Sequence, residues 1–318
     1  MSKKIISVVG ATGVQGRSVV NTLLKDNKYS IRAITRNPNS ERAKSLASQG
    51  VEVVKADLND FDSLIAAFHG SSYIYGITDF FEPFAKNGPE KAVEIEVAQG
   101  INIAKAAAAT KTLEHYIWST LPNGRKVSNG KFIIPHFEAK NVIDQYIKSD
   151  AALLAKTTFL WITFYATNYG FPMYKPYEIP TAGKYIQIQD TPPDVPIKSI
   201  GDAEANVGLF VKAILAQPNK TLPGKFVLAQ VEETTAGGML QTWAKAQGKT
   251  AQYVQVDSQT FHTIWPMWAE EMGTMMQFWD WAREKSWTGE VGILTKNDLN
   301  MKENFVGVEQ VFAGMNLW

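Results

Sequence analysis

Short apolar runs alternate with amphipathic stretches through the first half of the chain. The runs are rich in Val, Ile and Tyr and end near Gly, Asp or Asn, which is typical of buried strands, whereas the stretches between them carry apolar residues at helical spacing. Strands are predicted at 3–10, 30–36, 51–58, 71–78 and 115–120, and helices at 18–27, 40–50, 60–70 and 90–110. This alternation predicts an α/β fold with a parallel, doubly wound sheet and right-handed crossovers.

The pattern changes after Asp150. A further strand and loop at 157–170 precede a segment rich in Pro and Tyr, for which we expect irregular structure or a short hairpin. Helices are then predicted at 201–218 and 240–248, and strands at 224–229 and 250–256. We therefore expect a Rossmann domain over residues 1–165, to which the helix at 201–216 returns. A smaller, interleaved C-terminal α/β domain for a substrate or partner is expected over 166–318.

The composition excludes several classes of function. The chain has 318 residues with 32 basic and 31 acidic side chains, so its net charge of +1 does not favour direct binding of nucleic acid or of an anionic membrane. The absence of cysteine excludes disulfides, thiolate metal sites and a cysteine nucleophile, and the four scattered histidines predict no metal site. Neither a signal peptide nor a membrane span is recognisable, so we expect a cytoplasmic protein, with the nucleus as the alternative.

Three glycines follow the first predicted strand and precede the first helix. In the stretch GATGVQG, Gly10 permits a tight turn, Gly13 allows the backbone to approach phosphates, and Gly16 allows the helix to pack on the strand. The N–H groups and the dipole at the start of such a helix favour a diphosphate, so we predict a bound dinucleotide rather than a purely structural turn. The residues expected to bind it are Gly10, Thr12, Gly13, Val14, Gln15 and Gly16.

The end of the second predicted strand indicates which dinucleotide binds. A carboxylate there would hydrogen-bond the ribose hydroxyls of NAD, but the sequence has Arg36, in the stretch TRNP. A guanidinium suits a 2′-phosphate, so we favour NADP(H) over NAD, with a solvated strand-end arginine as the alternative. Asp57 and Leu58, after the third strand, are expected to flank the adenine. Ile77 and Thr78, after the fourth, are expected near the nicotinamide half.

Several stretches together resemble the NmrA-like family of atypical short-chain dehydrogenases/reductases. In chain order they are GATGVQG, TRNP, ADLND, EVAQGINIAKAA, HYIWST and HFEAK. The resemblance covers most of residues 1–215, and the remainder matches only in outline. It implies an NADP(H)-binding Rossmann fold with one of two roles. Some members of the family are reductases of small substrates, whereas others bind dinucleotides as regulators of transcription factors or as sensors of the NADPH/NADP ratio.

The resemblance also implies a catalytic centre with one unusual position. Ordinary members of the wider superfamily use a serine and a Tyr-x-x-x-Lys pair, in which the tyrosine protonates the substrate and the lysine holds the ribose. Here Ser119 stands at the serine position, Lys140 at the lysine position and His136 at the tyrosine position. The spacing places His136 and Lys140 on one face of a helix, so both side chains can meet one bound cofactor.

The charge state of His136 decides whether it can replace the tyrosine. Pro135 should begin the helix, which leaves His136 against the positive end of the helix dipole and near the like charge of Lys140. Both influences disfavour an imidazolium, so we expect a neutral His136 that donates hydrogen bonds but is a poor proton donor. The alternative for His136 is a packing and capping role, and for Ser119 it is a strand-end hydroxyl bonded to backbone.

Two further groups of residues are expected near the nicotinamide. Tyr165 is a catalytic candidate at the carboxyl edge of the sheet, and Asn168 either orients a ligand or stabilises the turn. The C-terminal stretch is dense in Trp and Met at helical spacing, which favours a core position for most of them. An adaptable apolar pocket over the dinucleotide is the alternative. These residues are Trp265, Met267, Trp268, Met272, Met275, Met276, Trp279, Trp281 and Trp287.

Two functions are open at this point. The first is an NADPH-dependent reductase of a small, largely apolar substrate, such as a conjugated, quinone-like or imine-like molecule. The second is a non-enzymatic NADP(H) sensor that acts through contact with a regulatory protein, as a transcriptional repressor does. The apolar C-terminal stretch favours the enzyme and the missing tyrosine favours the sensor. Of the two we favour the enzyme, as a monomer or a homodimer.

Overall fold

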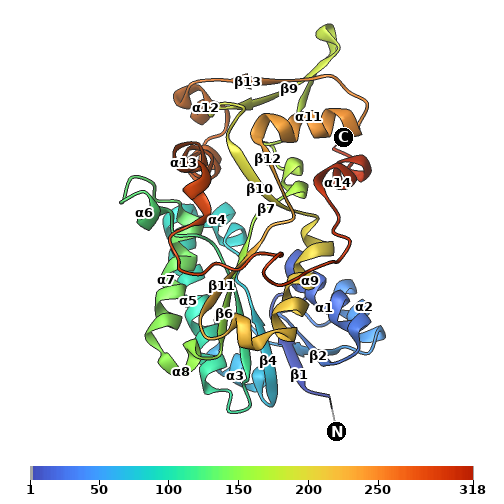
Figure 1. The fold of residues 1–318 in the computed structure, drawn as a ribbon, viewed down its shortest axis with the longest axis vertical. Helices are drawn as coiled ribbons and strands as arrows, with labels where there is room; N and C mark the ends of the chain where they lie inside the picture. The colour runs from blue at the N-terminus through green and yellow to red at the C-terminus, as the bar shows by residue number, and fades with distance from the viewer. Residues whose placement is uncertain (1–2, 318) are drawn as a thin grey trace.

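A seven-stranded parallel sheet forms the centre of the molecule (Figure 1). The computed structural model describes residues 3–317. In sheet order the strands are β11 Lys225–Ala229, β6 Thr157–Ile162, β5 His115–Thr120, β4 Ser71–Gly76, β1 Ile5–Val8, β2 Ser30–Thr35 and β3 Glu52–Lys55. Successive strands are added on one side of β1 as far as β3 and then on the other side from β4 onward, so the order reverses between β1 and β4.

Helices cover both faces of this sheet. On one face lie α1 Val14–Asp26, α2 Glu41–Ser48 and α9 Ala203–Ala216, whose apolar side chains share a buried cluster with β1 and β2. On the other face lie α3 Phe61–Phe68, α5 Pro89–Ala109 and α7 Pro135–Ser149. A parallel sheet with both faces covered is the doubly wound, Rossmann-like α/β fold, which confirms the prediction made from the alternating pattern.

Local sequence explains where several of these elements begin. Ser40, Asp60 and Asp202 each accept backbone N–H groups at the start of a helix, which satisfies donors that the first helical turn leaves unpaired. Pro135 begins α7, as predicted, because proline lacks the N–H that would be unpaired at that position. β5 and β6 are buried along their whole length, as expected for central strands of a sheet covered on both faces.

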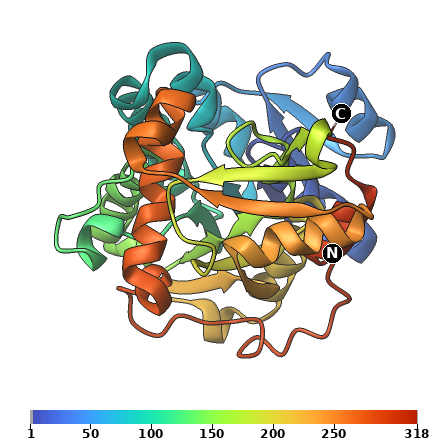
Figure 2. The same cartoon turned by 90° about the horizontal axis from the view of Figure 1, so that it is seen from above.

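A second region lies above the carboxyl ends of the large sheet (Figures 1 and 2). Its strands form two three-stranded sheets: β12 Glu232–Thr235, β10 Pro196–Gly201 and β7 Phe164–Tyr165, and β13 Ala251–Gln255, β9 Lys184–Gln189 and β8 Tyr177–Ile179. Its helices are α11 Ala236–Ala246, α12 Ser258–Ile264, α13 Thr274–Ala282 and α14 Val308–Gly314. Between β10 and β12 the chain returns to the large sheet, where α9 packs against α1 and β11 pairs with β6.

Short helices complete the fold, and the sequence pattern anticipates none of them. They are α4 Phe81–Asn87, α6 Gly124–Val127, α8 Ala151–Leu154 and α10 Pro218–Thr221. The longest is α4, which follows β4 and ends before Gly88, where a φ of 80° turns the chain into α5. The division of the chain near residue 165 stays a prediction. Within residues 3–317, no helix has both the length and the apolar character that crossing a membrane requires.

Candidate functional site

A cavity of about 800 Å³ lies at the carboxyl ends of the parallel strands. Ligands of open α/β sheets bind at this edge, beside the point where the strand order reverses. The volume lies in the upper part of the range of about 300–1,000 Å³ that ligand pockets span. Every residue that the sequence predicts to bind or act on a ligand lines this cavity, and the individual roles stay predictions. These residues are Gly10, Thr12, Gly13, Val14, Gln15, Gly16, Arg36, Asp57, Leu58, Ile77, Thr78, Ser119, His136, Lys140, Tyr165 and Asn168.

The glycine loop forms one wall of the cavity and leaves room for a close approach. Gly10 has a φ of +63°, a conformation that side chains disfavour. A Cβ at Gly16 would lie 2.2 Å from the carbonyl oxygen of Gly10, so only glycine fits there. Gly13 supplies no side-chain cap to α1, and no acidic residue lies in its first turn. The N–H groups at the start of α1 are therefore available to a ligand.

Gln15 connects three hydroxyl groups beside this loop. Its Oε1 accepts hydrogen bonds from the hydroxyls of Tyr75 (2.5 Å) and Ser119 (2.8 Å). Its Nε2 donates to the phenol oxygen of Tyr165. Burial raises the pKa of Tyr165 to about 12, so the phenol keeps its proton at neutral pH and can donate it in a hydrogen bond. Ser119 thus bonds a side chain of the glycine loop rather than the backbone.

Opposite charges meet where the adenosine end of the dinucleotide is predicted. Arg36 Nη2 donates to Glu82 Oε2 at 2.7 Å, and Lys86 Nζ donates to Glu82 Oε1 at 3.0 Å. These hydrogen bonds, that from Arg36 above all, lower the pKa of Glu82 to about 2. Glu82 belongs to α4, so the sequence at the end of β2 gives no indication of this ion pair. The Arg36 side chain is still 64% exposed and remains accessible to a ligand.

Lys140 is buried and held by groups from two other elements. Its Nζ donates to Thr78 Oγ1 at 2.6 Å and to the Thr78 carbonyl at 3.2 Å, and it lies 3.0 Å from Glu96 Oε1. Glu96, on α5, is fully buried and also accepts a hydrogen bond from Thr78 Oγ1 at 2.6 Å. An unpaired buried ammonium would be strongly unfavourable, and Glu96 compensates it. Sequence reasoning did not single out this carboxylate.

His136 pairs with a carboxylate from the C-terminal stretch. Glu271 Oε1 accepts a hydrogen bond from the backbone N–H of His136 at 3.2 Å and also bonds the ring Nδ1. Glu271 is fully buried and lies in a π-helix, Ala269–Gly273. The expectation of a neutral His136 takes account only of the helix dipole and Lys140. Glu271 is a further charged neighbour of the ring, and the neutral state of His136 stays a prediction.

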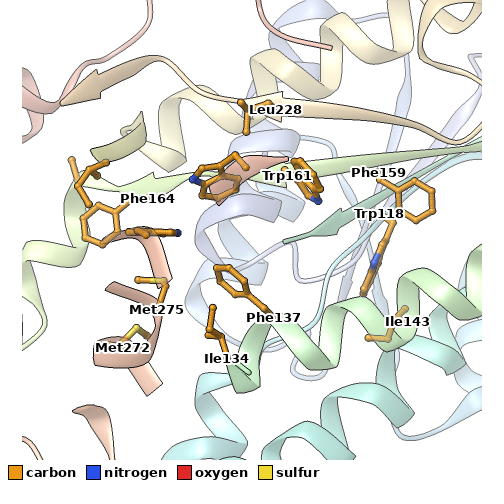
Figure 3. Packing of buried hydrophobic residues seen from close by; sticks show 14 of the residues in the cluster. Trp118, Ile134, Phe137, Ile143, Phe159, Trp161, Phe164, Leu228, Met272 and Met275 are labelled. Atoms are coloured by element: carbon orange, nitrogen blue, oxygen red, sulfur yellow. The ribbon is translucent and has the colours of Figure 1, made fainter. Parts of the chain in front are cut away.

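An apolar wall covers another part of the cavity. It consists of Phe80, Phe81, Met272, Met275, Trp279 and Trp287. Figure 3 shows Met272 and Met275 in the buried cluster that also contains Phe137, near the start of α7. Other tryptophans of the same stretch, Trp265 and Trp268, pack against aromatic side chains. Met272, Met275, Met276, Trp279 and Trp287 therefore belong to the buried core, and all of these except Met276 also line the cavity. That they lie over a dinucleotide stays a prediction.

The remaining buried histidine has a structural position. His115 Nε2 lies 2.7 Å from Thr158 Oγ1, and burial lowers the pKa of His115 to about 4, so its ring is neutral at neutral pH. His69 follows the last residue of α3, where its carbonyl accepts a hydrogen bond from Arg32. Among the residues that the structure describes, no three His, Asp or Glu side chains are grouped as a metal ion would require.

Sequence comparisons place the chain among proteins with this architecture. The sequence profile of the NmrA-like family matches residues 2–305. An NmrA-like family domain-containing protein of Dictyostelium discoideum is 32% identical over 263 residues, which are 81% of this chain and 82% of that protein. An NmrA-like family domain-containing oxidoreductase of Aspergillus hancockii is 28% identical over 277 residues, which are 82% of this chain and 78% of that protein.

Solved structures share the fold at low sequence identity. NmrA, a negative transcriptional regulator, has a TM-score of 0.78 in its complex with NAD (19% identity, 100% of this chain and 99% of that chain) and 0.76 in its complex with NADP (19%, 98% and 95%). The triphenylmethane reductase of Citrobacter sp. complexed with NADP(H) has a TM-score of 0.67 (20%, 97% and 99%). The NADPH-dependent quinone oxidoreductase of Escherichia coli complexed with NADPH has a TM-score of 0.65 (17%, 97% and 99%).

Proposed function

The chain belongs to the NmrA-like family, and from this premise we propose that it is an NADPH-dependent oxidoreductase that reduces a small, largely apolar acceptor. The observation that carries the proposal is the composition of the cavity. One set of lining groups consists of the glycine loop, the guanidinium of Arg36 and the buried Lys140. The other set consists of the apolar wall and the polar side chains of Ser119, His136 and Tyr165. The first set suits a dinucleotide, and the second set suits an acceptor molecule beside it.

The residues present fit a phosphorylated dinucleotide. The N–H groups at the start of α1 would hold the diphosphate, Arg36 the 2′-phosphate, and Lys140 the ribose next to the nicotinamide. Because Gly13 has no side chain, phosphate oxygens can approach the backbone of the glycine loop closely. We favour NADP(H) over NAD because an arginine rather than a carboxylate follows β2. When bound, the reduced nicotinamide supplies a hydride.

The chain's own side chains orient the acceptor. Tyr165 keeps its proton at neutral pH and can donate a hydrogen bond to a polar atom of the acceptor, while Gln15 fixes the phenol oxygen and the Ser119 hydroxyl relative to each other. The aromatic and Met side chains of the wall contact the apolar part of the acceptor and exclude water from it. A conjugated molecule that carries a carbonyl oxygen or an imine nitrogen, such as a quinone, an enone or an imine, matches this arrangement.

Relatives with both kinds of role support the two candidates. The relative in Aspergillus hancockii is named an oxidoreductase, and two of the structural neighbours are a triphenylmethane reductase and a quinone oxidoreductase. NmrA is a negative transcriptional regulator, which supports the alternative of a non-enzymatic sensor that acts by protein contact. The observation that favours this alternative is His136 at the position of the usual tyrosine.

The test is to mix the purified protein with NADPH and a panel of quinones, enones and imines and to follow the absorbance of the reduced nicotinamide. We expect turnover that Lys140→Ala lowers by about 100-fold or more, because a misplaced cofactor costs about that much. Lys105→Ala, at an exposed position of α5, is the matched control and should leave turnover unchanged. The double variant Lys140→Ala/Glu96→Gln, which leaves no unpaired buried charge, should show the same loss as Lys140→Ala.

One result would contradict the enzyme. If NADPH binds saturably and more tightly than NADP, yet no acceptor in the panel is reduced, the protein is a dinucleotide sensor and the reductase proposal fails.

A further inference from the structure

Two buried carboxylates meet two basic side chains near the start of α7. His136 and Lys140 are each 7% exposed, and each is paired with a fully buried glutamate from another element. Burying a carboxylate is unfavourable unless a cation or several hydrogen bonds compensate it. Glu96 is explained by the lysine that it orients toward the cavity. Glu271 does not line the cavity, so its place beside His136 needs a separate explanation.

Glu271 holds the ring of His136 in one orientation. A single oxygen, Oε1, accepts hydrogen bonds from the ring Nδ1 and from the backbone N–H of the same residue. The other oxygen, Oε2, is buried and has no hydrogen-bond partner in the described part of the chain. The π-helix that carries Glu271 is a rare geometry, found frequently at functional sites. Because Nδ1 donates to Glu271, Nε2 is the ring nitrogen left for a ligand.

Nε2 of His136 opens onto the cavity. His136 lines the cavity, and within residues 3–317 its Nε2 has no hydrogen-bond partner and is not enclosed by protein. The ring lies against the apolar wall, with centroids 5.9 Å from Phe80 and 5.6 Å from Phe81. An acceptor that rests on these aromatic rings therefore presents its polar atom to Nε2.

Charged groups of both signs surround His136. Lys140 and the N-terminus of α7 are positive, whereas Glu271 and, beyond the lysine, Glu96 are negative. Glu138, on the same helix, is engaged in an ion pair with Arg125. The neighbouring side chains from the α4 region, Phe80 and Phe81, carry no charge. The fully buried carboxylate of Glu271 is the charged group nearest to the ring nitrogens.

We propose that His136 and Glu271 form a proton-donating dyad for acceptors whose reduction leaves negative charge on oxygen, an inference that rests on the proposed function. The bound reduced nicotinamide would supply a hydride to a carbon of the conjugated carbonyl system, and the displaced π pair would move to the carbonyl oxygen. The Nε2–H bond of His136 breaks, its proton forms the O–H bond, and the neutral imidazole regains a proton from solvent. Glu271 is a positioning residue, because it acts only through His136.

The test compares two acceptors in the full-length protein with Glu271→Gln, which keeps a hydrogen-bond acceptor and removes the charge. A benzoquinone requires a proton together with the hydride, whereas a triarylmethyl cation becomes neutral with the hydride alone. We expect kcat for the quinone to fall about tenfold or more, with the KM for NADPH unchanged. The rate with the cation should stay within about twofold, because no proton is transferred to it.

Matched variants separate the dyad from a general disturbance of α7. His136→Gln should show the same dependence on the acceptor, and the double variant should lose no more than His136→Gln alone, because both residues act in one unit. Glu138→Gln, which removes a carboxylate from the same helix at its surface ion pair, should change neither rate. Melting temperatures of the variants show whether each is folded.

A second measurement requires no turnover. In the wild-type protein, proton NMR of the four histidine rings should show a low-field Nδ1 proton that disappears in His136→Gln. The lack of this signal, or an equal loss of rate with both acceptors in Glu271→Gln, would overturn the dyad and leave the reductase proposal intact. If neither acceptor is reduced by the wild type, the proposed function itself fails, and the NMR signal still tests the pairing.

Discussion

At the scale of the residue, Arg36 is a guanidinium that already has a partner. Glu82 accepts a hydrogen bond from it at 2.7 Å, and Lys86 holds the other oxygen of the same carboxylate. In the proposed complex, a 2′-phosphate would compete with Glu82 for Arg36 and would gain two cationic neighbours, Arg36 and Lys86. NAD has no phosphate at this position, so we expect its binding to depend much less on the pair. We therefore expect this competition to set the preference between the two dinucleotides.

Arg36→Glu should weaken NADP binding by about 10- to 100-fold and NAD binding much less, because a hydrogen bond to a charged group contributes about 1.5–3 kcal/mol. Glu82→Gln should strengthen NADP binding, since it removes both the competitor for Arg36 and a charge that repels phosphate. Both changes are measured by calorimetric titration with NADP and with NAD. Lys44→Glu, which alters the charge of an exposed residue of α2, is the control. Equal losses of NADP and NAD binding in Arg36→Glu would contradict the assignment of NADP.

Asp144 should make stability depend on pH. This α7 carboxyl accepts a hydrogen bond from Trp118 Nε1 at 2.9 Å, and burial raises its pKa to about 7. In the unfolded chain an aspartate has a pKa of about 3.9, so between about pH 4 and pH 7 the folded protein binds more protons than the unfolded chain. The contribution of Asp144 to the free energy of unfolding is therefore full below about pH 4 and is lost as the pH rises to 7.

Asp144→Asn should remove this dependence, because the amide keeps an acceptor for Trp118 and does not titrate. We expect the free energy of unfolding of the variant to rise relative to that of the wild type by about 1 kcal/mol per pH unit between about pH 4 and pH 7. Above about pH 7 the difference between the two proteins should stay constant. Urea unfolding of both proteins at several pH values measures the difference. Burial lowers the pKa of His115, so its contribution to stability changes with pH in the opposite direction. His115 is present in both proteins, and its contribution therefore cancels in the difference between them. A difference that does not change with pH would contradict this account.

His136 shows which parts of the candidate site can be predicted from sequence. The spacing within one helix places His136 and Lys140 on the same face, and the structure has them there. Glu271 lies 135 residues further on, and no spacing rule connects it to His136. The density of Trp and Met around Glu271 indicates only a core or an apolar pocket. A carboxylate inside such a stretch is itself a signal, because it needs a buried partner, but the sequence does not identify that partner.

At the scale of the element, the contact between α1 and α9 brings a distant part of the chain back to the glycine loop. Gly208 of α9 lies so close to α1 that its N–H donates to Ser18 Oγ at 2.8 Å. A Cβ at Gly208 would lie 2.2 Å from the Ser18 carbonyl oxygen and 2.3 Å from Thr22 Oγ1. The two helices can therefore approach this closely only with glycine at 208.

Gly208→Ala should lower the free energy of unfolding by about 1–3 kcal/mol, the usual effect of inserting a methyl group into a packed contact. Gly314→Ala, in open space at the end of α14, should change it by no more than about 0.5 kcal/mol. Thermal or chemical unfolding of the two variants provides the comparison. Equal stability of the two variants would show that α1 and α9 can move apart without cost.

The elements of the large sheet are predictable because their signals are local. Buried strands, capping residues and Pro135 act within a few residues of the elements that they define. Helix α4 lacks such a signal: it is short, and Phe80, before its first residue, provides no side-chain cap. The π-helix at 269–273 likewise has no local signal in the sequence.

At the scale of the whole molecule, the two ends of the cavity come from different parts of the chain. The loops that follow the parallel strands supply the end proposed to bind the dinucleotide, whereas the C-terminal stretch supplies much of the apolar wall. Figure 1 shows α13, which belongs to this stretch, above α4 and α7. The sequence identifies both groups of residues, but only the fold brings them into one cavity. The domain boundary near residue 165 remains a prediction. Two elements that follow it in the chain, α9 and β11, belong to the layers of the large sheet.

The central claim is that NADPH occupies this cavity, and calorimetric titration of the wild-type protein tests it most directly. The account predicts saturable binding of one NADPH per chain, about tenfold or more tighter than NADH, because Arg36 contacts the additional phosphate. No heat of binding with NADPH at millimolar concentration, or tighter binding of NADH than of NADPH, would contradict the account.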